Sequence, residues 1–311
     1  MLKILDKEES IFLLDCGEGT AHQLSLVTPT AADHVALYQR LKMVYISHMH
    51  ADHHLGLCQV LQTWQTYHTE ERQLYLAGPA RLMAWLREYA TVQPGLLDNV
   101  LFLSNDTMVP GATRSPNVDE HVRRAWSALG LQQMTNVVAK HCYQSFSVVL
   151  DHQTAGRLVY SGDTRPNAQL VKHGLRARLL VHEATFENDL LEEAKQKRHS
   201  TIDEALTVAR DMKAEYVLLT HFSQRYPDGA AVHYRQPKPS VKQATSSGEE
   251  ESEEEKSDAQ KLALPAVIAF DLMQIKLSQF WKMRYYKKAI YLAQDESNLY
   301  DDQASQEDVL L

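Results

Sequence analysis

The sequence predicts an α/β fold in which two β-sheets pack together and helices flank them. Three observations predict this fold. Short apolar runs with strand character alternate with longer amphipathic segments along most of the chain. An apolar share of 44% is enough for a packed core in a chain of 311 residues. Histidines and aspartates directly follow several of the apolar runs, so we expect their side chains along one edge of the sheets.

The N-terminal part is expected to begin with a hairpin. Residues 2–5 and 10–14 are apolar and flank a charged turn. Asp15-Cys-Gly17-Glu-Gly19 then bends the chain, because glycine allows positive φ, and residues 20–27 begin a helix. On these grounds Asp15 is either a turn residue or a support for the loop that follows the next strand.

The most informative stretch follows an apolar run at residues 43–46, which reads as a short buried strand. His48, His50, Asp52 and His53 come within six residues before a helical pattern resumes. His48 and His50 are two residues apart, so at an extended strand end they point the same way. Imidazole and carboxylate without thiolate are typical of catalytic zinc. The alternative is a histidine-rich surface turn, which this order of residues disfavours.

The rest of the chain alternates between strands and helices and places further polar residues at strand ends. The expected strands lie at residues 73–77, 100–104, 134–140, 145–150, 157–160, 179–181 and 215–219, and the expected helices at 80–90, 118–129, 190–197 and 202–212. His141, Asp163, Glu183 and His221 each follow a strand. Asp163 is placed either to bridge two cations or to cap a helix that starts after Pro166.

Two segments near these strand ends carry further candidates. His199 precedes Thr201 and Glu204, which are spaced as a capping box, so it is either a proton donor or a residue before a cap. Arg225 and Tyr226 follow His221 and supply a guanidinium and a phenol suited to phosphate. The alternative for these two is an exposed polar loop.

Composition limits the classes of protein and partner. Residues 249–258 and 295–311 each carry a net charge of −6, so the remainder of a chain with net charge −8 carries +4, which permits an RNA partner. No apolar run approaches the roughly 18 residues needed to span a membrane. Three cysteines, Cys16, Cys58 and Cys142, favour a reducing, intracellular compartment. Cys142 is expected to be a small buried filler rather than a ligand.

These motifs, in this order, resemble the metallo-β-lactamase superfamily and, within it, the catalytic half of long-form tRNase Z. The resemblance covers residues 11–277. It rests on Leu13-Leu-Asp15-Cys-Gly-Glu-Gly-Thr20, Ile46-Ser-His48-Met-His-Ala-Asp-His53-His54, Lys140-His141-Cys142, Tyr160-Ser-Gly-Asp163-Thr164, Val181-His-Glu183-Ala-Thr185, Arg198-His199-Ser-Thr201 and Thr220-His221-Phe-Ser-Gln-Arg-Tyr226. It implies the αββα sandwich of that superfamily.

The resemblance also implies an activity and a site. The chain would be a zinc-dependent endoribonuclease that removes the 3′ trailer from precursor tRNA by phosphodiester hydrolysis and leaves a 3′-hydroxyl end. Ion one would take His48, His50, His141 and Asp163, and ion two would take Asp52, His53, His221 and the shared Asp163. Asp52 would orient or deprotonate the nucleophile, and His199, steered by Glu183, would protonate the departing oxygen. Asp15 would buttress the metal loop, and Arg225 and Tyr226 would contact phosphate.

The implied organisation is a catalytic domain at residues 1–226, a disordered acidic insertion at 227–262, a closing hairpin and helix of the same domain at 263–294, and an acidic tail at 295–311. The first strand of the family fold, with its Gly-Thr-Gly-Ser-like loop, does not occur here. Neither does the N-terminal half that grips tRNA. We therefore expect a truncated chain with intact chemistry and a weak grip on its substrate, and either a homodimer or pairing with the missing half.

Long-form relatives work in the nucleus and mitochondrion, which are the compartments that the resemblance implies.

Two other functions are compatible with the same residues. One rival is another hydrolase of the superfamily that acts on a thioester or lactam, and it would not be expected to carry the segments at His199 and Arg225. A second rival is an inactive binding or scaffold protein, which would be expected to have gaps among the seven ligands. The sequence has no such gaps.

Overall fold

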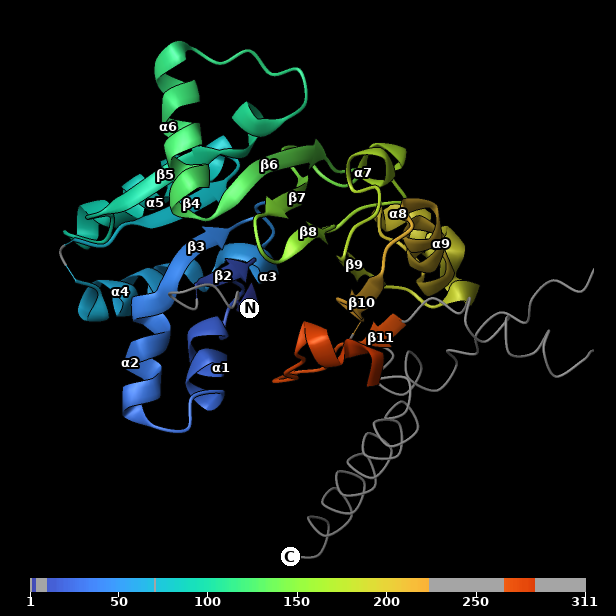
Figure 1. The fold of residues 1–311 in the computed structure, drawn as a ribbon, viewed down its shortest axis with the longest axis horizontal. Coiled ribbons are helices and arrows are strands. Elements are labelled where there is room, and N and C mark those ends of the chain that lie inside the picture. The colour runs from blue at the N-terminus through green and yellow to red at the C-terminus, as the bar shows by residue number, and fades with distance from the viewer. Residues whose placement is uncertain (1, 4–9, 70, 224–265, 283–311) are drawn as a thin grey trace, which may run out of the picture.

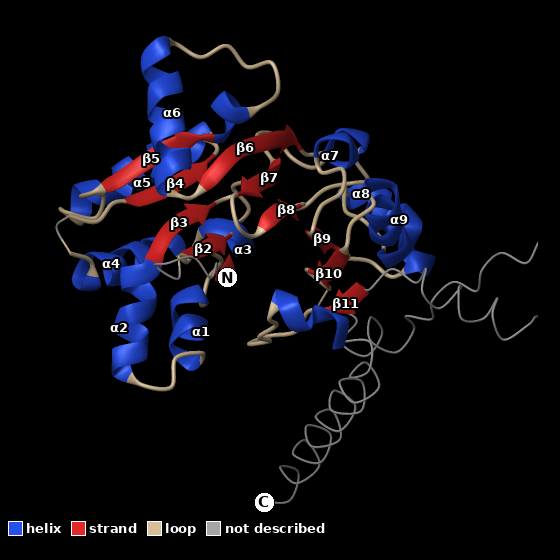
Figure 2. Cartoon of the chain, viewed as in Figure 1, coloured by secondary structure: helices blue, strands red, loops and turns tan. Residues whose placement is uncertain are grey.

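The computed structural model describes residues 2–3, 10–69, 71–223 and 266–282. These residues form two β-sheets that pack face to face, with helices on both outer surfaces (Figures 1 and 2). The predicted α/β sandwich is confirmed. Across these ranges, no helix has both the length and the apolar character that a membrane crossing requires.

The first sheet holds five strands in chain order and is parallel apart from its first pair. Its strands are β1 (Leu2–Lys3), β2 (Ile11–Leu14), β3 (Leu41–Tyr45), β4 (Leu74–Gly78) and β5 (Val100–Ser104). The short edge strand β1 pairs antiparallel with β2, with Leu2 opposite Phe12, which agrees with the expected N-terminal hairpin.

The second sheet holds six strands in the order β11-β10-β9-β8-β7-β6. They are β6 (Leu131–Val138), β7 (Phe146–His152), β8 (Gly156–Tyr160), β9 (Leu179–Glu183), β10 (Tyr216–Thr220) and β11 (Ala266–Ile268). The first three are antiparallel, so the predicted hairpin of β6 and β7 is present. From β8 onward the strands run parallel. Because parallel strands point their carboxyl ends to the same edge, loops after β8, β9 and β10 meet there.

Helices cover both outer faces and appear at the two sides of the molecule in Figure 1. In chain order the helices are α1 (Thr20–Leu26), α2 (Ala31–Arg40), α3 (Ala51–His54), α4 (Leu57–Tyr67), α5 (Ala80–Val92), α6 (Pro116–Ala128), α7 (Ala168–His173), α8 (Leu191–Lys197) and α9 (Ile202–Met212), with short 3₁₀ turns at Asn105–Met108, Asn188–Leu190 and Leu277–Lys282. Helix α6 differs from the others, since its Val122 and Ala125 join the core between the sheets. The capping box of Thr201 and Glu204 at the start of α9 is present. Helix α2 was not among the predicted elements.

Alternation along the strands produces the layers. On β2, Phe12 faces the space between the sheets, where it joins the core that includes Met134 and Leu150 of the second sheet. Ile11 and Leu13 point the other way, into the core beneath α1, α2, α4 and α5. Successive strand residues face opposite sides of a sheet, so one strand serves two cores. A third core lies between the second sheet and helices α7 and α9.

Of the two roles open to Asp163, the helix cap is excluded. Asn167, not Asp163, caps α7, since the Asn167 side chain accepts a hydrogen bond from the backbone N–H of Gln169. The closing hairpin and helix expected at residues 263–294 lie only partly within the described residues. There β11 pairs parallel with β10, and no second strand follows within residues 269–282. A parallel neighbour needs a crossover connection, so β10 is not the hairpin partner of β11, and the hairpin stays a prediction.

Parts of the predicted organisation lie outside the described residues. These are the acidic insertion at 227–262, the acidic tail at 295–311, and the remainder of the helix expected beyond residue 282.

Candidate metal centre

The seven predicted ligands converge at one edge of the two sheets. They come from the loop after β3, the turn between β6 and β7, and the loops after β8 and β10. Their ligand atoms form overlapping groups in which all atoms lie within 4.8 Å of one another. The groups contain all seven predicted ligands, together with Cys142, Glu183 and His199; the seven are His48, His50, Asp52, His53, His141, Asp163 and His221.

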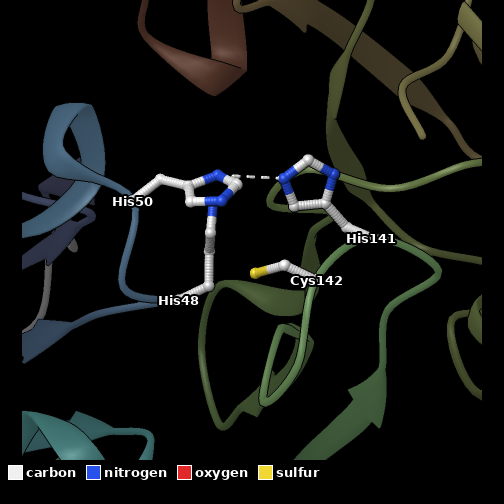
Figure 3. A group of neighbouring side chains, drawn as sticks. All are labelled: His48, His50, His141 and Cys142. Atoms are coloured by element: carbon white, nitrogen blue, oxygen red, sulfur yellow. Dashed lines mark hydrogen bonds between the residues drawn. The ribbon is translucent and has the colours of Figure 1, made fainter. Parts of the chain in front are cut away.

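The first group is drawn in Figure 3, with His48 and His50 on one segment and His141 and Cys142 on another. The Nε2 atom of His141 lies 3.1 Å from Nδ1 of His50. Three imidazoles from two segments therefore face a common point. His50 is the residue before α3, in extended conformation, so the chain leaves the strand and turns into the helix at this point.

Cys142 is not the buried filler that we expected. Its side chain is half-buried, and its thiol belongs to the same group of ligand atoms as the three imidazoles in Figure 3. Burial raises the pKa of the Cys142 thiol. The buried cysteines are Cys16 and Cys58.

Asp163 lies between the two groups of histidines. Its Oδ2 is 3.6 Å from Nε2 of His48, 3.6 Å from Nε2 of His141 and 3.2 Å from Nε2 of His53. Its Oδ1 is 3.5 Å from Nε2 of His221. A carboxylate that faces imidazoles on both sides is placed to bridge two cations.

The ring orientations are set by hydrogen bonds to the nitrogens that face away from the centre. Nδ1 of His53 bonds the Asp15 carboxylate at 2.6 Å, and Nδ1 of His141 bonds the Arg198 carbonyl at 3.0 Å. Both partners only accept, so each Nδ1 carries a proton and each Nε2 faces the centre, where it can bind a cation once it is unprotonated. Metal-binding histidines in proteins are commonly oriented in this way.

Asp15 accepts four hydrogen bonds, one of them from a candidate ligand, although it lies more than 30 residues from its partners in the sequence. Its carboxylate accepts from the backbone N–H of Ser47 at 2.6 Å, the Ser47 hydroxyl at 2.7 Å, Nδ1 of His53 at 2.6 Å and the Tyr160 hydroxyl at 2.6 Å. The Ser47 hydroxyl in turn contacts Nδ1 of His48 at 2.9 Å. Asp15 therefore contacts His53 directly and His48 through Ser47.

The residues fit a bound cation. Nε2 of His48 and Nε2 of His53 are buried and have no hydrogen-bond partner, and a buried polar atom without a partner is costly. Burial lowers the pKa of His48 to about 3, which keeps it neutral as a ligand must be. Burial alone would raise the pKa of Asp163, but His53 and His221 hold it below its usual range. Burial alone would lower the pKa values of His53 and His221, but Asp15 raises that of His53 and Asp52 raises that of His221, so a cation bound here would displace protons from these two rings.

Asp52 lies at the exposed mouth of the centre. Its Oδ2 is 3.4 Å from both Nε2 of His53 and Nε2 of His221, and its side chain is 65% exposed. The contact with His221, together with that of His53, holds the pKa of Asp52 far below its usual range. Asp52 is therefore an ionised acceptor open to solvent.

His199 and Glu183 lie beside the centre as a pair. Nδ1 of His199 is 3.0 Å from Oε1 of Glu183, whose carboxylate also accepts from the backbone N–H groups of Thr164 at 2.8 Å and Ser200 at 3.1 Å. Glu183 is 1% exposed and its position is fixed by these bonds. Nδ1 of His199 is also 3.9 Å from Oδ2 of Asp163, so the pair adjoins the cluster of ligands.

Arg225 and Tyr226, the predicted phosphate contacts, lie outside the described residues. Four residues of the site were not predicted from the sequence. They contact Asp15, His221 or His141, and they are Ser47, Tyr160, Thr185 and Arg198. All four lie within the quoted motifs, which is the signal that could have identified them. Their contacts are with residues distant in the sequence, and no local pattern predicts such contacts.

Comparison with known proteins finds a matching family model and several relatives. A family model described as Anti-Pycsar protein Apyc1 matches residues 3–235. Ribonuclease Z 1 of Schizosaccharomyces pombe is 33% identical over 291 residues, which are 93% of this chain and 32% of that protein. Zinc phosphodiesterase ELAC protein 2 of Gorilla gorilla gorilla is 37% identical over 223 residues, which are 70% of this chain and 27% of that protein.

A solved structure matches as well. The crystal structure of a long-form RNase Z from yeast superposes with a TM-score of 0.69 and 26% identity, over 88% of this chain and 38% of that one. The chain thus spans about a third of the length of the curated relatives that it matches.

Proposed function

We infer the function of this chain from its family: it belongs to the family described by the Apyc1 model, and it is a ribonuclease Z homologue with the metallo-β-lactamase fold. We propose that it is a zinc-dependent endoribonuclease that removes the 3′ trailer from precursor tRNA. The observation that carries the proposal is the joint presence, at one sheet edge, of a complete cluster of five histidines and two aspartates and an adjoining His199–Glu183 pair.

The cluster would hold two zinc ions. His48, His50, His141 and Asp163 would hold the first, and Asp52, His53, His221 and the shared Asp163 the second. The unpartnered Nε2 atoms of His48 and His53 support this assignment. When bound, the ions would supply Lewis-acid activation of water and of the scissile phosphate.

The chain's own residues would then handle the protons. Asp52, ionised and open to solvent, orients the attacking water or accepts its proton as the water attacks phosphorus. His199 gives a proton to the departing ribose oxygen as its bond to phosphorus breaks. Glu183 accepts from Nδ1 of His199 and so turns Nε2 toward the substrate. Arg225 and Tyr226 remain our sequence-based candidates for phosphate contacts.

The test is a precursor tRNA with a short 3′ trailer, incubated with the full chain in zinc or manganese. We expect one cut that releases the trailer and leaves a 3′-hydroxyl. His50→Ala should abolish the cut, because it removes a ligand. His199→Ala should slow it roughly 10²- to 10⁴-fold, the usual contribution of a general acid. Glu192→Gln, on the exposed α8 and away from the cluster, serves as the matched control and should cut normally.

Other outcomes would reject the proposal. Hydrolysis of a thioester or lactam without any cut in RNA would assign the site to another hydrolase of the fold. Zinc binding with no hydrolysis of any of these substrates would favour a binding protein.

A further inference from the structure

Thr185 lies where the two halves of the site meet. It follows β9, and its hydroxyl oxygen is 2.6 Å from Oε2 of Glu183, 2.8 Å from Nδ1 of His221 and 3.2 Å from Nδ1 of His199. One side chain thus contacts a proposed zinc ligand, the proposed acid and the carboxylate beside that acid. Neither the sequence motifs nor the mechanism above gives this hydroxyl a role.

The chemistry of the three partners fixes where the protons lie. The Glu183 carboxylate receives backbone N–H groups on both oxygens, so it acts as an acceptor and the single Thr185 proton points at Oε2. The hydroxyl then has only lone pairs left for the histidines. His221 must therefore donate through Nδ1, and so must His199, whose Nδ1 also faces Oε1 of Glu183.

Donation through Nδ1 leaves both Nε2 atoms for the reaction. For His221, Nε2 faces Asp52 at 3.4 Å and Asp163 at 3.5 Å, where the proposed second zinc would bind. For His199, Nε2 is the atom left to carry a proton to the substrate. The opposite tautomer of His221 would place a proton on the nitrogen that faces the proposed zinc. The opposite tautomer of His199 would leave no proton on the nitrogen that faces the leaving group.

The same arrangement occurs on the other side of the centre. There the Ser47 hydroxyl donates to the Asp15 carboxylate at 2.7 Å and contacts Nδ1 of His48 at 2.9 Å. Each side of the centre therefore has a carboxylate that orients a hydroxyl, and a hydroxyl that orients a histidine. The Thr185 side differs because its one hydroxyl serves two histidines.

We propose that Thr185 is a positioning residue that fixes the tautomers of His221 and His199 together, and so couples zinc binding at the second position to protonation of the leaving group. The zinc part of this proposal stands on the geometry alone. The leaving-group part rests on the proposed function.

The test compares Thr185→Val, which keeps the shape and loses the hydroxyl, with Thr185→Ser, which keeps the hydroxyl. The first readout is zinc affinity, measured by competition with a chromophoric chelator and without any substrate. We expect Thr185→Val to weaken the second zinc roughly 10- to 100-fold, as removal of an outer hydrogen-bond partner usually does. Thr185→Ser should bind like the wild type.

The second readout is a ratio of rates at saturating zinc. Bis(p-nitrophenyl) phosphate releases a stable phenolate that needs no proton, whereas RNA releases a ribose oxygen that does. We expect Thr185→Val to lower the ratio of RNA cleavage to ester cleavage by at least about 10-fold. In a His199→Ala background the same substitution should leave that ratio unchanged, because the acid is already absent.

Matched controls separate this proposal from general damage and from failure of the proposed function. Thr207→Val removes an exposed hydroxyl on α9 that bonds only within the helix, and it should change neither readout. If circular dichroism shows that Thr185→Val does not fold, Thr185→Ala replaces it.

Wild-type zinc affinity and an unchanged rate ratio in the hydroxyl-free variant would overturn the proposal. A serine variant as impaired as valine would do so too. Absence of RNA cleavage by the wild type would reject the nuclease function, while the zinc readout would still decide the His221 part.

Discussion

Replacement of Asp15 by asparagine is the most direct test of how the centre is held. The two carboxylate oxygens of Asp15 accept four hydrogen bonds from Ser47, His53 and Tyr160, at 2.6 to 2.7 Å. Asparagine has nearly the same shape but only one accepting oxygen. If that oxygen takes the position of Oδ2, the amide group faces the backbone N–H of Ser47, and two donors oppose each other. If the amide is flipped, it faces His53 instead.

The magnitude follows from these contacts. A buried N–H without an acceptor costs roughly 1–3 kcal/mol, so the free energy of unfolding of the metal-free protein should fall by about that much. The bond to His53 also loses its ionic character. Outer partners of ligands usually contribute 10- to 100-fold in metal affinity, which is about 1.4–2.8 kcal/mol. Because Asp15 reaches His53 directly and His48 through Ser47, we expect both zinc positions to weaken.

Zinc competition with a chromophoric chelator measures the affinity, and urea unfolding of the metal-free protein measures stability. Tyr160→Phe is the matched control, since it removes one donor to the same oxygen and leaves the bonds to His53 and Ser47 in place. We expect its zinc affinity to fall less than about tenfold. An Asp15→Asn variant that binds both zincs as tightly as the wild type would refute the reasoning.

Three further predictions concern the surroundings of the centre. A Cβ at Gly17 would lie 2.1 Å from the carbonyl oxygen of Asp52, so Gly17→Ala must displace the loop that carries Asp52 and should lower zinc affinity roughly 10-fold or more; normal affinity would contradict this packing. Thiol labelling of the native protein should modify Cys142 alone, because its side chain is only half-buried, whereas Cys16 and Cys58 are buried and burial raises their pKa values to about 12 and about 11; mass spectrometry of labelled peptides would reveal any other site. Burial alone would raise the pKa of Asp15, but its contacts with His53 lower it. Ionised Asp15 thus stabilises the metal-free fold at pH values above its unfolded-state pKa of about 3.9, and this stabilisation is lost as the pH falls through the lower folded-state pKa. In urea unfolding at a series of pH values, Asp15→Asn should reduce the fall in the free energy of unfolding at acid pH. The same fall in the variant and the wild type would contradict this prediction.

The sequence determined most of the helices and strands of this protein, though not α2, and the types of its candidate ligands, because both depend on short-range patterns. Alternation of residues 11 to 13 on one strand already assigns side chains to two faces, and the structure places them in two different cores. The spacing of His48, His50 and His53 places three imidazoles at one junction between a strand and a helix. The capping box at Thr201 is likewise a property of four consecutive residues.

Tertiary structure decided what those groups touch. The bond from His141 to the Arg198 carbonyl joins residues 57 apart, and that from Tyr160 to Asp15 joins residues 145 apart. No local pattern encodes such a partner, because the contact exists only once the two sheets have packed and brought the strand ends to one edge. The pairing of β11 parallel to β10 has the same origin. Local sequence decides that a segment forms a strand, whereas tertiary packing decides which strand it pairs with.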